Sequence, residues 1–318
     1  MMKISSVVRK FRDNYHVSRV LARVLFPVQR ACLWLNRQIV WKVRMNGATV
    51  ERDGMRLVFP RDVGVMYCSL FWWLGMEGYE PRTWLILKHF LERCKTFYDI
   101  GSNIGLYSVL ARRVSPRVVV ETFEPIPSLY EGNRRFHMAN GYATEGIHHV
   151  ALSDEEGSVL MNVYRYAGQV EVEPTATAES GVNLSPGAVA ETITVNRIRL
   201  DQFVATHAPK GPMLIKLDVE GHELAVLRGA TDTLAHVRPI MICEMLPSAD
   251  RNREVMLLLE KAGYRAFAIC KEGLFRMQLE DFALGRDFTD FLCLPEEACG
   301  GMGSYTGYAD LNRIRVGI

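Results

Sequence analysis

The stretch Asp99-Ile100-Gly101-Ser102-Asn103-Ile104-Gly105-Leu106-Tyr107-Ser108 decides the fold of this chain. It continues a mostly apolar run at 96–98 and leads into an apolar helical pattern over 104–113, which predicts a buried strand, a tight turn and a helix. Glycine at 101 permits backbone angles that other residues avoid and lets the chain approach a ligand closely. The first N–H groups of the helix can bind a negatively charged group. The stretch therefore predicts a β-α unit with a ligand-binding turn, although a turn that binds nothing also fits these residues.

The spacing of the two glycines disfavours two common ligand classes. The pattern Gly101-x-x-x-Gly105 differs from the G-x-G-x-x-G pattern that is typical of oxidoreductases with a nicotinamide dinucleotide. No G-x-x-x-x-G-K-[ST] pattern follows, so a phosphate-cradling P-loop is not indicated.

A second strand over 117–123 ends at Glu124, roughly 20 residues beyond the glycine turn, where an acid grips ribose hydroxyls in nucleotide-type sites. A carboxylate can accept hydrogen bonds from two hydroxyls at once. The position therefore predicts a ribose-binding role for Glu124. The alternative is an exposed acid in a turn that caps the next helix.

The residues 213–223, Met-Leu-Ile-Lys-Leu-Asp-Val-Glu-Gly-His-Glu, form the second informative stretch. They read as a buried strand, a polar turn with glycine and the start of a helix that uses apolar positions up to Leu234. Repeated β-α units predict a mostly parallel sheet with helices on both faces. Ligands of such sheets bind beyond the carboxyl ends of the strands, so we expect the acids at these ends to share one site. They are Asp99, Glu124, Asp218, Glu220 and Glu244.

The remaining patterns complete a series of strands and helices. We expect a hairpin within 46–66, helices over 82–93, 128–139 and 251–262, and strands over 148–154, 157–164, 192–198, 238–244, 265–270 and 288–294. The polar residues 168–190 are expected to form a loop, either a lid over a site or a disordered surface segment.

Three motifs in these stretches resemble the FkbM-type family of class I S-adenosylmethionine-dependent methyltransferases. They are D-x-G-x-N-x-G-x-Y-S from Asp99, F-E-P-x-P from Phe123 and K-x-D-x-E-G-x-E from Lys216. The resemblance covers about 78–294, including Gly78-Tyr79-Glu80 before the first motif. It implies a doubly wound, Rossmann-like class I methyltransferase fold with a mostly parallel seven-stranded sheet whose last strand is antiparallel. It also implies S-adenosyl-L-methionine as the cofactor.

The resemblance further implies a role for each motif residue. The methionine half of the cofactor would lie against Asp99, Gly101, Asn103 and Gly105, the ribose against Glu124, and the adenine against Ala151, Leu152 and Ser153. The catalytic candidates on the acceptor side are Asp218, Glu220 and His222.

Several roles of these residues stay open. Asp218 could instead hold the amino group of the cofactor. Together with Glu244 it could also bind a divalent cation through oxygen ligands, although no metal site is predicted. His222 has an unperturbed pKa that suits a base, but a histidine in the first turn of a helix is often a surface or capping residue. Lys216 is expected to pair with a neighbouring carboxylate.

The function implied by the resemblance is O-methylation of a hydroxyl on a sugar, a glycan or a related natural product. A hydroxyl is a poor nucleophile at neutral pH, so a base or a metal would assist. The alternatives are a dinucleotide-dependent oxidoreductase on a similar sheet and a cofactor-binding module without catalysis. The missing G-x-G-x-x-G pattern disfavours the first, and the intact acids disfavour the second.

The distribution of charge separates the start of the chain from the remainder. The 318 residues carry a net charge of +2, but residues 1–45 hold ten Lys/Arg and one Asp, a net +9 that leaves −7 for the remainder. We expect a basic helical extension over 1–60, a methyltransferase domain over 61–295 and an irregular tail over 296–318. The arm, with Trp34 and Trp41 at helical spacing, could bind an anionic membrane surface, pack on the domain or form a dimer.

Other partners and the compartment follow from composition. No motif for nucleic-acid recognition accompanies the basic arm, so we expect no nucleic acid. The seven cysteines are scattered without a C-x-x-C pattern, which predicts buried free thiols in a reducing compartment. No uncharged apolar run approaches the length of a membrane span. The sequence thus predicts a cytoplasmic protein, peripheral at most to a membrane.

Overall fold

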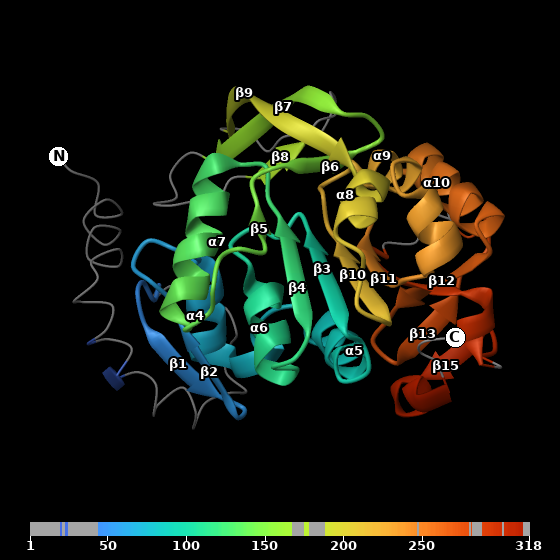
Figure 1. Cartoon of the computed structure of the whole chain (residues 1–318). Coiled ribbons are helices and arrows are strands. Elements are labelled where there is room, and N and C mark those ends of the chain that lie inside the picture. Colours follow the sequence, from blue (N-terminus) through green and yellow to red (C-terminus); the bar gives the residue numbers. More distant parts are fainter. Residues whose placement is uncertain are drawn as a thin grey trace.

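A nine-stranded sheet forms the centre of the molecule in this computed structural model (Figure 1). The structure describes residues 20, 23–24, 44–166, 175–177, 188–246, 248–279, 281, 288–300 and 302–313. The strands, in their order across the sheet, are β5 (Ile147–His148), β4 (Val119–Phe123), β3 (Thr96–Ile100), β10 (Met213–Leu217), β11 (Ile240–Glu244), β14 (Asp290–Pro295), β12 (Tyr264–Ile269), β13 (Gly273–Arg276) and β15 (Tyr305–Gly307).

The strand directions confirm the predicted fold class. Strands β5, β4, β3, β10 and β11 run parallel, and β14 runs antiparallel between β11 and β12. These seven strands match the seven that the sequence predicts, with β14 as the antiparallel one. Two antiparallel strands, β13 and β15, extend the sheet beyond them. The extension includes residues of the segment expected to be an irregular tail, because β15 finds hydrogen-bond partners on β13.

Helices cover both faces of the sheet because successive strand residues point to opposite sides. On β3, Phe97 belongs to one apolar core, whereas Tyr98 and Ile100 belong to the other. The first core is covered by α4 (Val65–Leu74), α5 (Pro81–Leu91), α6 (Leu106–Val114) and α7 (Pro127–Ala139). The second core is covered by α8 (Leu200–Thr206), α9 (Glu223–Arg228) and α10 (Ala249–Lys261).

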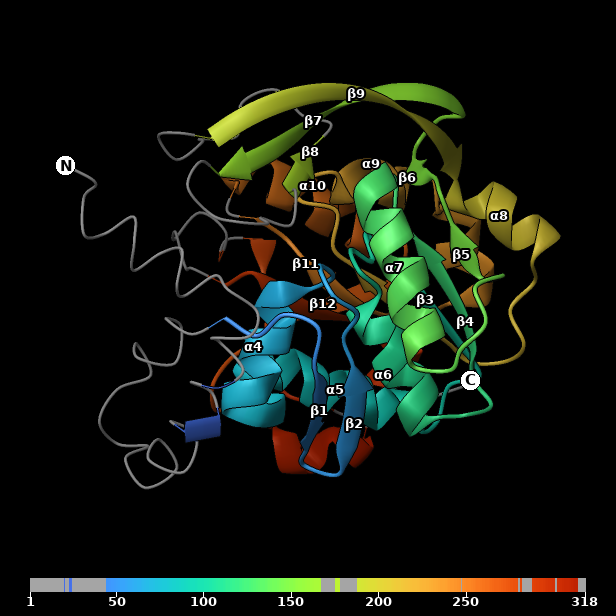
Figure 2. The same ribbon diagram turned by 90° about the vertical axis from the view of Figure 1, so that its left-hand side faces the viewer.

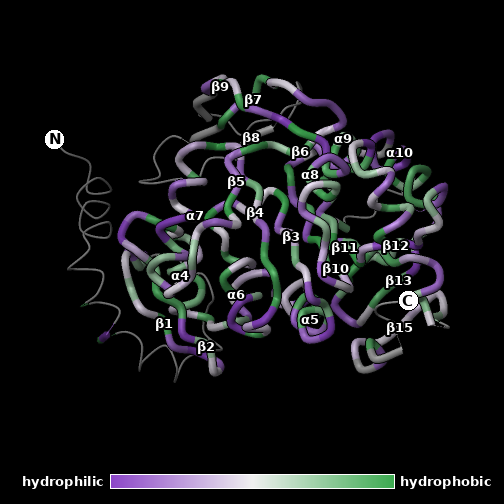
Figure 3. Tube along the Cα trace, in the orientation of Figure 1, coloured by the Kyte–Doolittle hydropathy of each residue, from purple (hydrophilic) through white to green (hydrophobic). Residues whose placement is uncertain are grey.

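The central strands are buried on both faces. Every residue of β3 and β10 is buried, including the charged Asp99 and Lys216. Hydrophobic stretches follow β10 and β11 through the middle of the molecule (Figure 3). Such continuous apolar runs are typical of parallel strands between two helical layers.

Two smaller sheets flank the large one. The predicted hairpin is confirmed as β1 (Thr49–Arg52) and β2 (Met55–Val58), which lie beside α4 (Figure 2). The other small sheet has the order β6 (Ala151–Ser153), β9 (Ala188–Arg199), β7 (Gly157–Tyr166) and β8 (Thr175–Thr177). Its long β7–β9 pair spans one end of the large sheet (Figures 1 and 2). Most of the loop predicted over 168–190 lies outside the described residues.

Two predicted elements are interrupted in the structure. The strand predicted over 148–154 is divided, because β5 pairs with β4 in the large sheet while β6 pairs with β9 in the small one. The helix predicted to reach Leu234 ends at Arg228. A Cβ atom on the next residue, Gly229, would lie 1.9 Å from the carbonyl oxygen of Ser153, so the chain turns there against β6. A π-helical turn, η2 (Thr233–Val237), follows.

Three short 3-10 helices complete the described elements: η1 (Gly75–Gly78), η4 (Glu296–Cys299) and η5 (Tyr308–Arg313). The six cysteines within the described ranges are unpaired, and five of them are buried. No helix in this part of the chain is both long and apolar enough to cross a membrane. The basic arm lies almost entirely outside the described residues, so its membrane-binding and dimer roles stay predictions.

The turn after β3 depends on the absence of a side chain at Gly101. This residue has φ +76°, and a Cβ atom there would lie 1.8 Å from the carbonyl oxygen of Asp218. The turns after β3 and β10 can approach each other this closely only because residue 101 is glycine.

We expect Gly101→Ala to destabilise the protein more than Gly141→Ala. Gly141 has a similar φ of +81°, but no atom lies within 4 Å of where its Cβ atom would stand, so alanine there meets only the backbone penalty, about 1–2 kcal/mol. The clash at Gly101 should add roughly 1–3 kcal/mol. Denaturant unfolding of both variants measures the difference. Equal losses of stability would show that the two turns are not held in contact.

Candidate functional site

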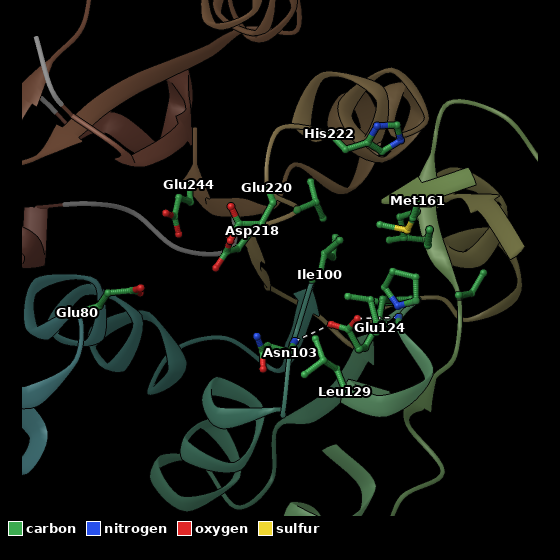
Figure 4. A pocket seen from close by; sticks show the side chains of 18 of the residues that line it. Glu80, Ile100, Asn103, Glu124, Leu129, Met161, Asp218, Glu220, His222 and Glu244 are labelled. Atoms are coloured by element: carbon green, nitrogen blue, oxygen red, sulfur yellow. Dashed lines mark hydrogen bonds between the residues drawn. The ribbon is translucent and has the colours of Figure 1, made fainter. Parts of the chain in front are cut away.

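A cavity lies at the carboxyl ends of the central strands, enclosing about 880 Å³ including the solvent at its mouth. Figure 4 shows it from close by. Its wall combines carboxylic acids at one end with apolar side chains at the other. The lining residues are Tyr67, Tyr79, Glu80, Ile100, Gly101, Asn103, Phe123, Glu124, Pro125, Ile126, Leu129, Val150, Ala151, Leu152, Met161, Asp218, Val219, Glu220, His222 and Glu244.

Backbone hydrogen bonds join the ends of three strands beneath the cavity. The N–H groups of Gly101 and Ser102 donate to the carbonyl of Phe123, which ends β4. The N–H of Asp218 donates to the carbonyl of Ile100, which ends β3. The backbone of Asn103 and Glu220 is left-handed, with φ of 51° and 52°. Strained backbone of this kind clusters at functional sites, so both turns fit a binding role.

Glu124 is a buried carboxylate with two backbone partners. Its Oε2 accepts a hydrogen bond of 2.8 Å from the N–H of Asn103, and its Oε1 accepts one of 2.9 Å from the N–H of Ile126 (Figure 4). Only 3% of the residue is exposed, so it is not the exposed turn acid that the sequence left as an alternative. Burial raises the pKa of Glu124 to about 8, although these two hydrogen bonds act to lower it.

Three of the predicted cofactor residues lie behind the cavity wall. Asp99 is buried and accepts a hydrogen bond of 2.7 Å from the Ser108 hydroxyl, and burial raises its pKa to about 6. Gly105 precedes α6, with no room for a Cβ atom beside Asn133. Ser153 is fully buried under the strand end. These residues shape the turns, whereas the other predicted residues line the cavity itself.

Lys216 is a buried cation beneath the acidic end of the cavity. Its Nζ donates to Oδ2 of Asp218 at 2.7 Å and lies 4.9 Å from the ring centre of Tyr107. Burial disfavours its charge, but the carboxylates of Asp218, Glu80 and Glu244 outweigh that effect and raise the pKa of Lys216 above its usual value. Lys216 therefore stays charged and balances part of the surrounding negative charge, as the expected pairing with a carboxylate requires.

The acidic end gathers side chains from separate parts of the chain. Glu80, Asp218, Glu220 and Glu244 are labelled on the same side of the cavity in Figure 4. Burial, reinforced by the charge of Asp218, raises the pKa of Glu220 to about 7 and that of Glu244 to about 9. Sequence reasoning missed Glu80 as a site residue because it follows a helical turn rather than a strand. The Gly78-Tyr79-Glu80 element was the available signal.

His222 lies away from the acidic end. Its Nε2 is 2.9 Å from the hydroxyl of Ser153, and Figure 4 places its ring near Met161. The sequence grouped His222 with Asp218 and Glu220, but the structure brings it next to a residue of the expected adenine site.

Within the ranges that the structure describes, no group of three or more His, Cys, Asp or Glu side chains is arranged to hold a metal ion.

The comparison with protein families decides the identity of the fold. A family model described as Methyltransferase FkbM domain matches residues 99–266, more than half of the chain. The chain belongs to the FkbM methyltransferase family. This FkbM-family chain is therefore a methyltransferase, and the family recognised from the three motifs is confirmed.

Two curated relatives show what similar methyltransferases act on. The hexuronic acid methyltransferase AglP of Haloferax volcanii is 28% identical over 219 residues, which cover 68% of this chain and 80% of AglP. The 31-O-demethyl-FK506 methyltransferase FkbM of Streptomyces tacrolimicus is 27% identical over 191 residues, which cover 54% of this chain and 73% of the relative.

Among solved structures, a methyltransferase FkbM from Methylobacillus flagellatus KT is 15% identical to this chain. The match covers 63% of this chain and 43% of that protein. Its TM-score of 0.37 is too low to bear on the site.

The buried acids of this methyltransferase should make the ligand-free protein less stable as the pH rises. Glu124 and Glu244 have pKa values of about 8 and 9 when folded, against an ordinary value of 4.5. The folded state thus binds more protons than the unfolded state between these values. The contribution of each acid to stability is full below pH 4.5 and is lost through the folded pKa. We therefore expect the free energy of unfolding to fall between pH 5 and 9.

Denaturant unfolding across this pH range tests the expectation. Glu244→Gln should make the pH dependence shallower, whereas Glu131→Gln, on the surface of α7, should not change it. A wild-type stability that rises from pH 5 to 9 would contradict the role of the buried acids.

Proposed function

We propose that this methyltransferase binds S-adenosyl-L-methionine in the cavity and transfers its methyl group to a hydroxyl of a sugar, a glycan or a related natural product. The observation that carries the proposal is the buried carboxylate of Glu124 at the end of β4. The acceptor class is supported by the relatives, whose names specify a hexuronic acid and a demethylated natural product.

The residues present fit the cofactor. The ionised form of Glu124 has roughly four lone-pair positions, so it keeps two for ribose hydroxyls after its two backbone hydrogen bonds. Hydrogen bonds from the ribose would favour this ionised form and lower the raised pKa of Glu124. The apolar end of the cavity, with Ala151, Leu152 and Met161, would hold the adenine. His222, fixed by Ser153, lies where it could contact the adenine edge. The turn at Gly101 and Asn103 would hold the methionine part.

The acidic end then faces the acceptor. The cofactor supplies an electrophilic methyl group on a sulfonium, so the protein must align the acceptor and receive its proton. Glu220 has a pKa of about 7 and can accept a proton near neutral pH. Asp218, ion-paired with Lys216, would hold the acceptor hydroxyl or the amino group of the cofactor. Glu244, with a pKa of about 9, can donate a hydrogen bond to an acceptor oxygen.

Both alternatives from the sequence lose support. The family match disfavours a dinucleotide-dependent oxidoreductase. A module without catalysis would not need carboxylates gathered at a cavity from several elements, because buried carboxylates without a ligand are costly.

Replacement of Glu124 tests the cofactor site. Calorimetric titration should show that the wild-type protein binds S-adenosylhomocysteine and not NAD. Glu124→Ala removes the ribose acceptors, so binding should weaken by roughly 1.5–3 kcal/mol. Glu131→Ala serves as the surface control, and circular dichroism checks that each variant is folded. An unchanged dissociation constant in folded Glu124→Ala would reject the ribose assignment.

The pH dependence of methyl transfer tests the base. If Glu220 accepts the proton of the acceptor, kcat/KM should rise through about pH 7 and then level off, because the carboxylate must be ionised. Glu220→Gln should abolish most activity together with this rise, and Asp218→Asn should weaken activity by misplacing the acceptor. Transfer of a labelled methyl group provides the readout. A full pH-dependent rise in Glu220→Gln would assign the base to another residue.

A further inference from the structure

Glu80 reaches the cavity from outside the segment that the family model matches. It precedes the matched residues 99–266 and lies between η1 and α5. Its backbone is left-handed, with φ 39° and ψ 56°, directly before Pro81. A non-glycine residue in this conformation carries strain that the surrounding structure must offset. The Glu80 side chain lines the cavity, where Figure 4 shows it on the side of Asp218 and Glu244.

A chain of interactions fixes the Glu80 carboxylate. The hydroxyl of Tyr107 donates to Oε2 of Glu80 at 2.5 Å. The ring of the same tyrosine lies over the Nζ of Lys216, which pairs with Asp218. Tyr107 is buried, so the hydroxyl is held in place. One oxygen of Glu80 is thus occupied, and the half-buried side chain can offer the other to a ligand.

The charge balance at the acidic end of the cavity favours an acceptor without negative charge. Among the described residues that line the cavity are five carboxylic acids and neither lysine nor arginine. Lys216, the nearby cation, is 2% exposed and already bound to Asp218. Burial, reinforced by the negative charges of Asp218 and Glu80, raises the pKa values of Glu220 and Glu244, so this end of the cavity already disfavours negative charge. A further carboxylate would increase this repulsion, whereas an ammonium group would relieve it.

An aromatic wall stands beside Glu80. Tyr67 and Tyr79 line the cavity and meet edge to face, with ring centres 4.9 Å apart. Aromatic faces bind ammonium groups and the apolar faces of ring compounds. The two tyrosine rings and the carboxylates together form a surface that suits a hydroxyl compound whose ring is neutral or carries a cationic group.

We propose that Glu80 is a specificity-determining residue of the acceptor site. With the facing Asp218 and Glu244, it selects neutral or positively charged hydroxyl compounds, such as polyols and amino sugars, over compounds that carry a carboxylate. The selection is opposite to what a hexuronic acid would require, so the proposal predicts an acceptor other than the hexuronic acid named for the Haloferax volcanii relative. The proposal rests on the proposed function, since it places the transferable methyl group at the acidic end.

Four ligands of the cofactor site probe the acceptor site directly. A group attached at the position of the methyl must project toward the acceptor, because transfer requires the two to be aligned. S-adenosylhomocysteine carries no such group, and sinefungin carries an ammonium there. S-adenosylmethionine carries the methyl, and its S-carboxymethyl analogue carries a carboxylate. Calorimetry on the full chain should show sinefungin binding at least about tenfold tighter than S-adenosylhomocysteine. The carboxymethyl analogue should bind at least about tenfold more weakly than S-adenosylmethionine.

Variants assign this preference to Glu80. Glu80→Gln should reduce both ratios severalfold and leave the affinity for S-adenosylhomocysteine unchanged. Glu77→Gln removes an exposed carboxylate three residues earlier and should preserve both ratios. Tyr107→Phe removes the hydroxyl that holds Glu80 but keeps the ring over Lys216, so it should reduce the ratios in part. This variant keeps the test decisive if Glu80→Gln does not fold.

Different results would contradict the role of Glu80 and the proposed function. Equal binding of sinefungin and S-adenosylhomocysteine by the wild-type protein would overturn the proposal. Equal weakening of all four ligands in Glu80→Gln or Tyr107→Phe would also overturn it, since the residue would then be structural. Failure of S-adenosylhomocysteine itself to bind would instead reject the proposed function on which this inference rests.

Discussion

The contact between Gly101 and the carbonyl of Asp218 is the constraint on which the site depends. It sets the distance between the turns that follow β3 and β10, and no side chain larger than hydrogen fits at 101. The N–H of Asp218 in turn donates to the carbonyl of Ile100. Because these turns are held together, the acids of the turn after β10 lie next to the turn after β3, to which the proposed function assigns the cofactor. A methyl donor and an acceptor can then share one cavity.

The same close packing brings buried acidic side chains near one another, so electrostatic repulsion accompanies it. Glu124, Glu220 and Glu244 all have raised pKa values because burial and neighbouring carboxylates disfavour their charge. The positive charge of Lys216 offsets only part of the negative charge at the acidic end of the cavity. Sites with strongly perturbed carboxylates are typical of catalytic centres, where such groups exchange protons near neutral pH. In the ligand-free protein these unfavourable interactions of the carboxylates are not relieved. A cationic ligand, such as a sulfonium, would relieve them and would therefore bind more tightly.

Much of the fold could be predicted because local patterns agree with the global arrangement. Buried strands such as β3 and β10 have continuous apolar runs, and the acids at their ends meet as the parallel sheet requires. What sequence reasoning missed depends on contacts between distant segments. A hydrogen bond from the Tyr107 hydroxyl holds Glu80 at the acidic end of the cavity, and the Ser153 hydroxyl holds His222 at the other end. The division of 148–154 between two sheets follows from its pairing with β9, which no local pattern encodes.

The orientation of the cofactor is the central claim, and a crystal structure with S-adenosylhomocysteine tests it most directly. The account predicts the ribose hydroxyls on Glu124 and the adenine beside Ala151, Leu152 and His222. The thioether sulfur should point toward Asp218 and Glu80. A ligand with its sulfur at the His222 end, or bound outside this cavity, would contradict the account.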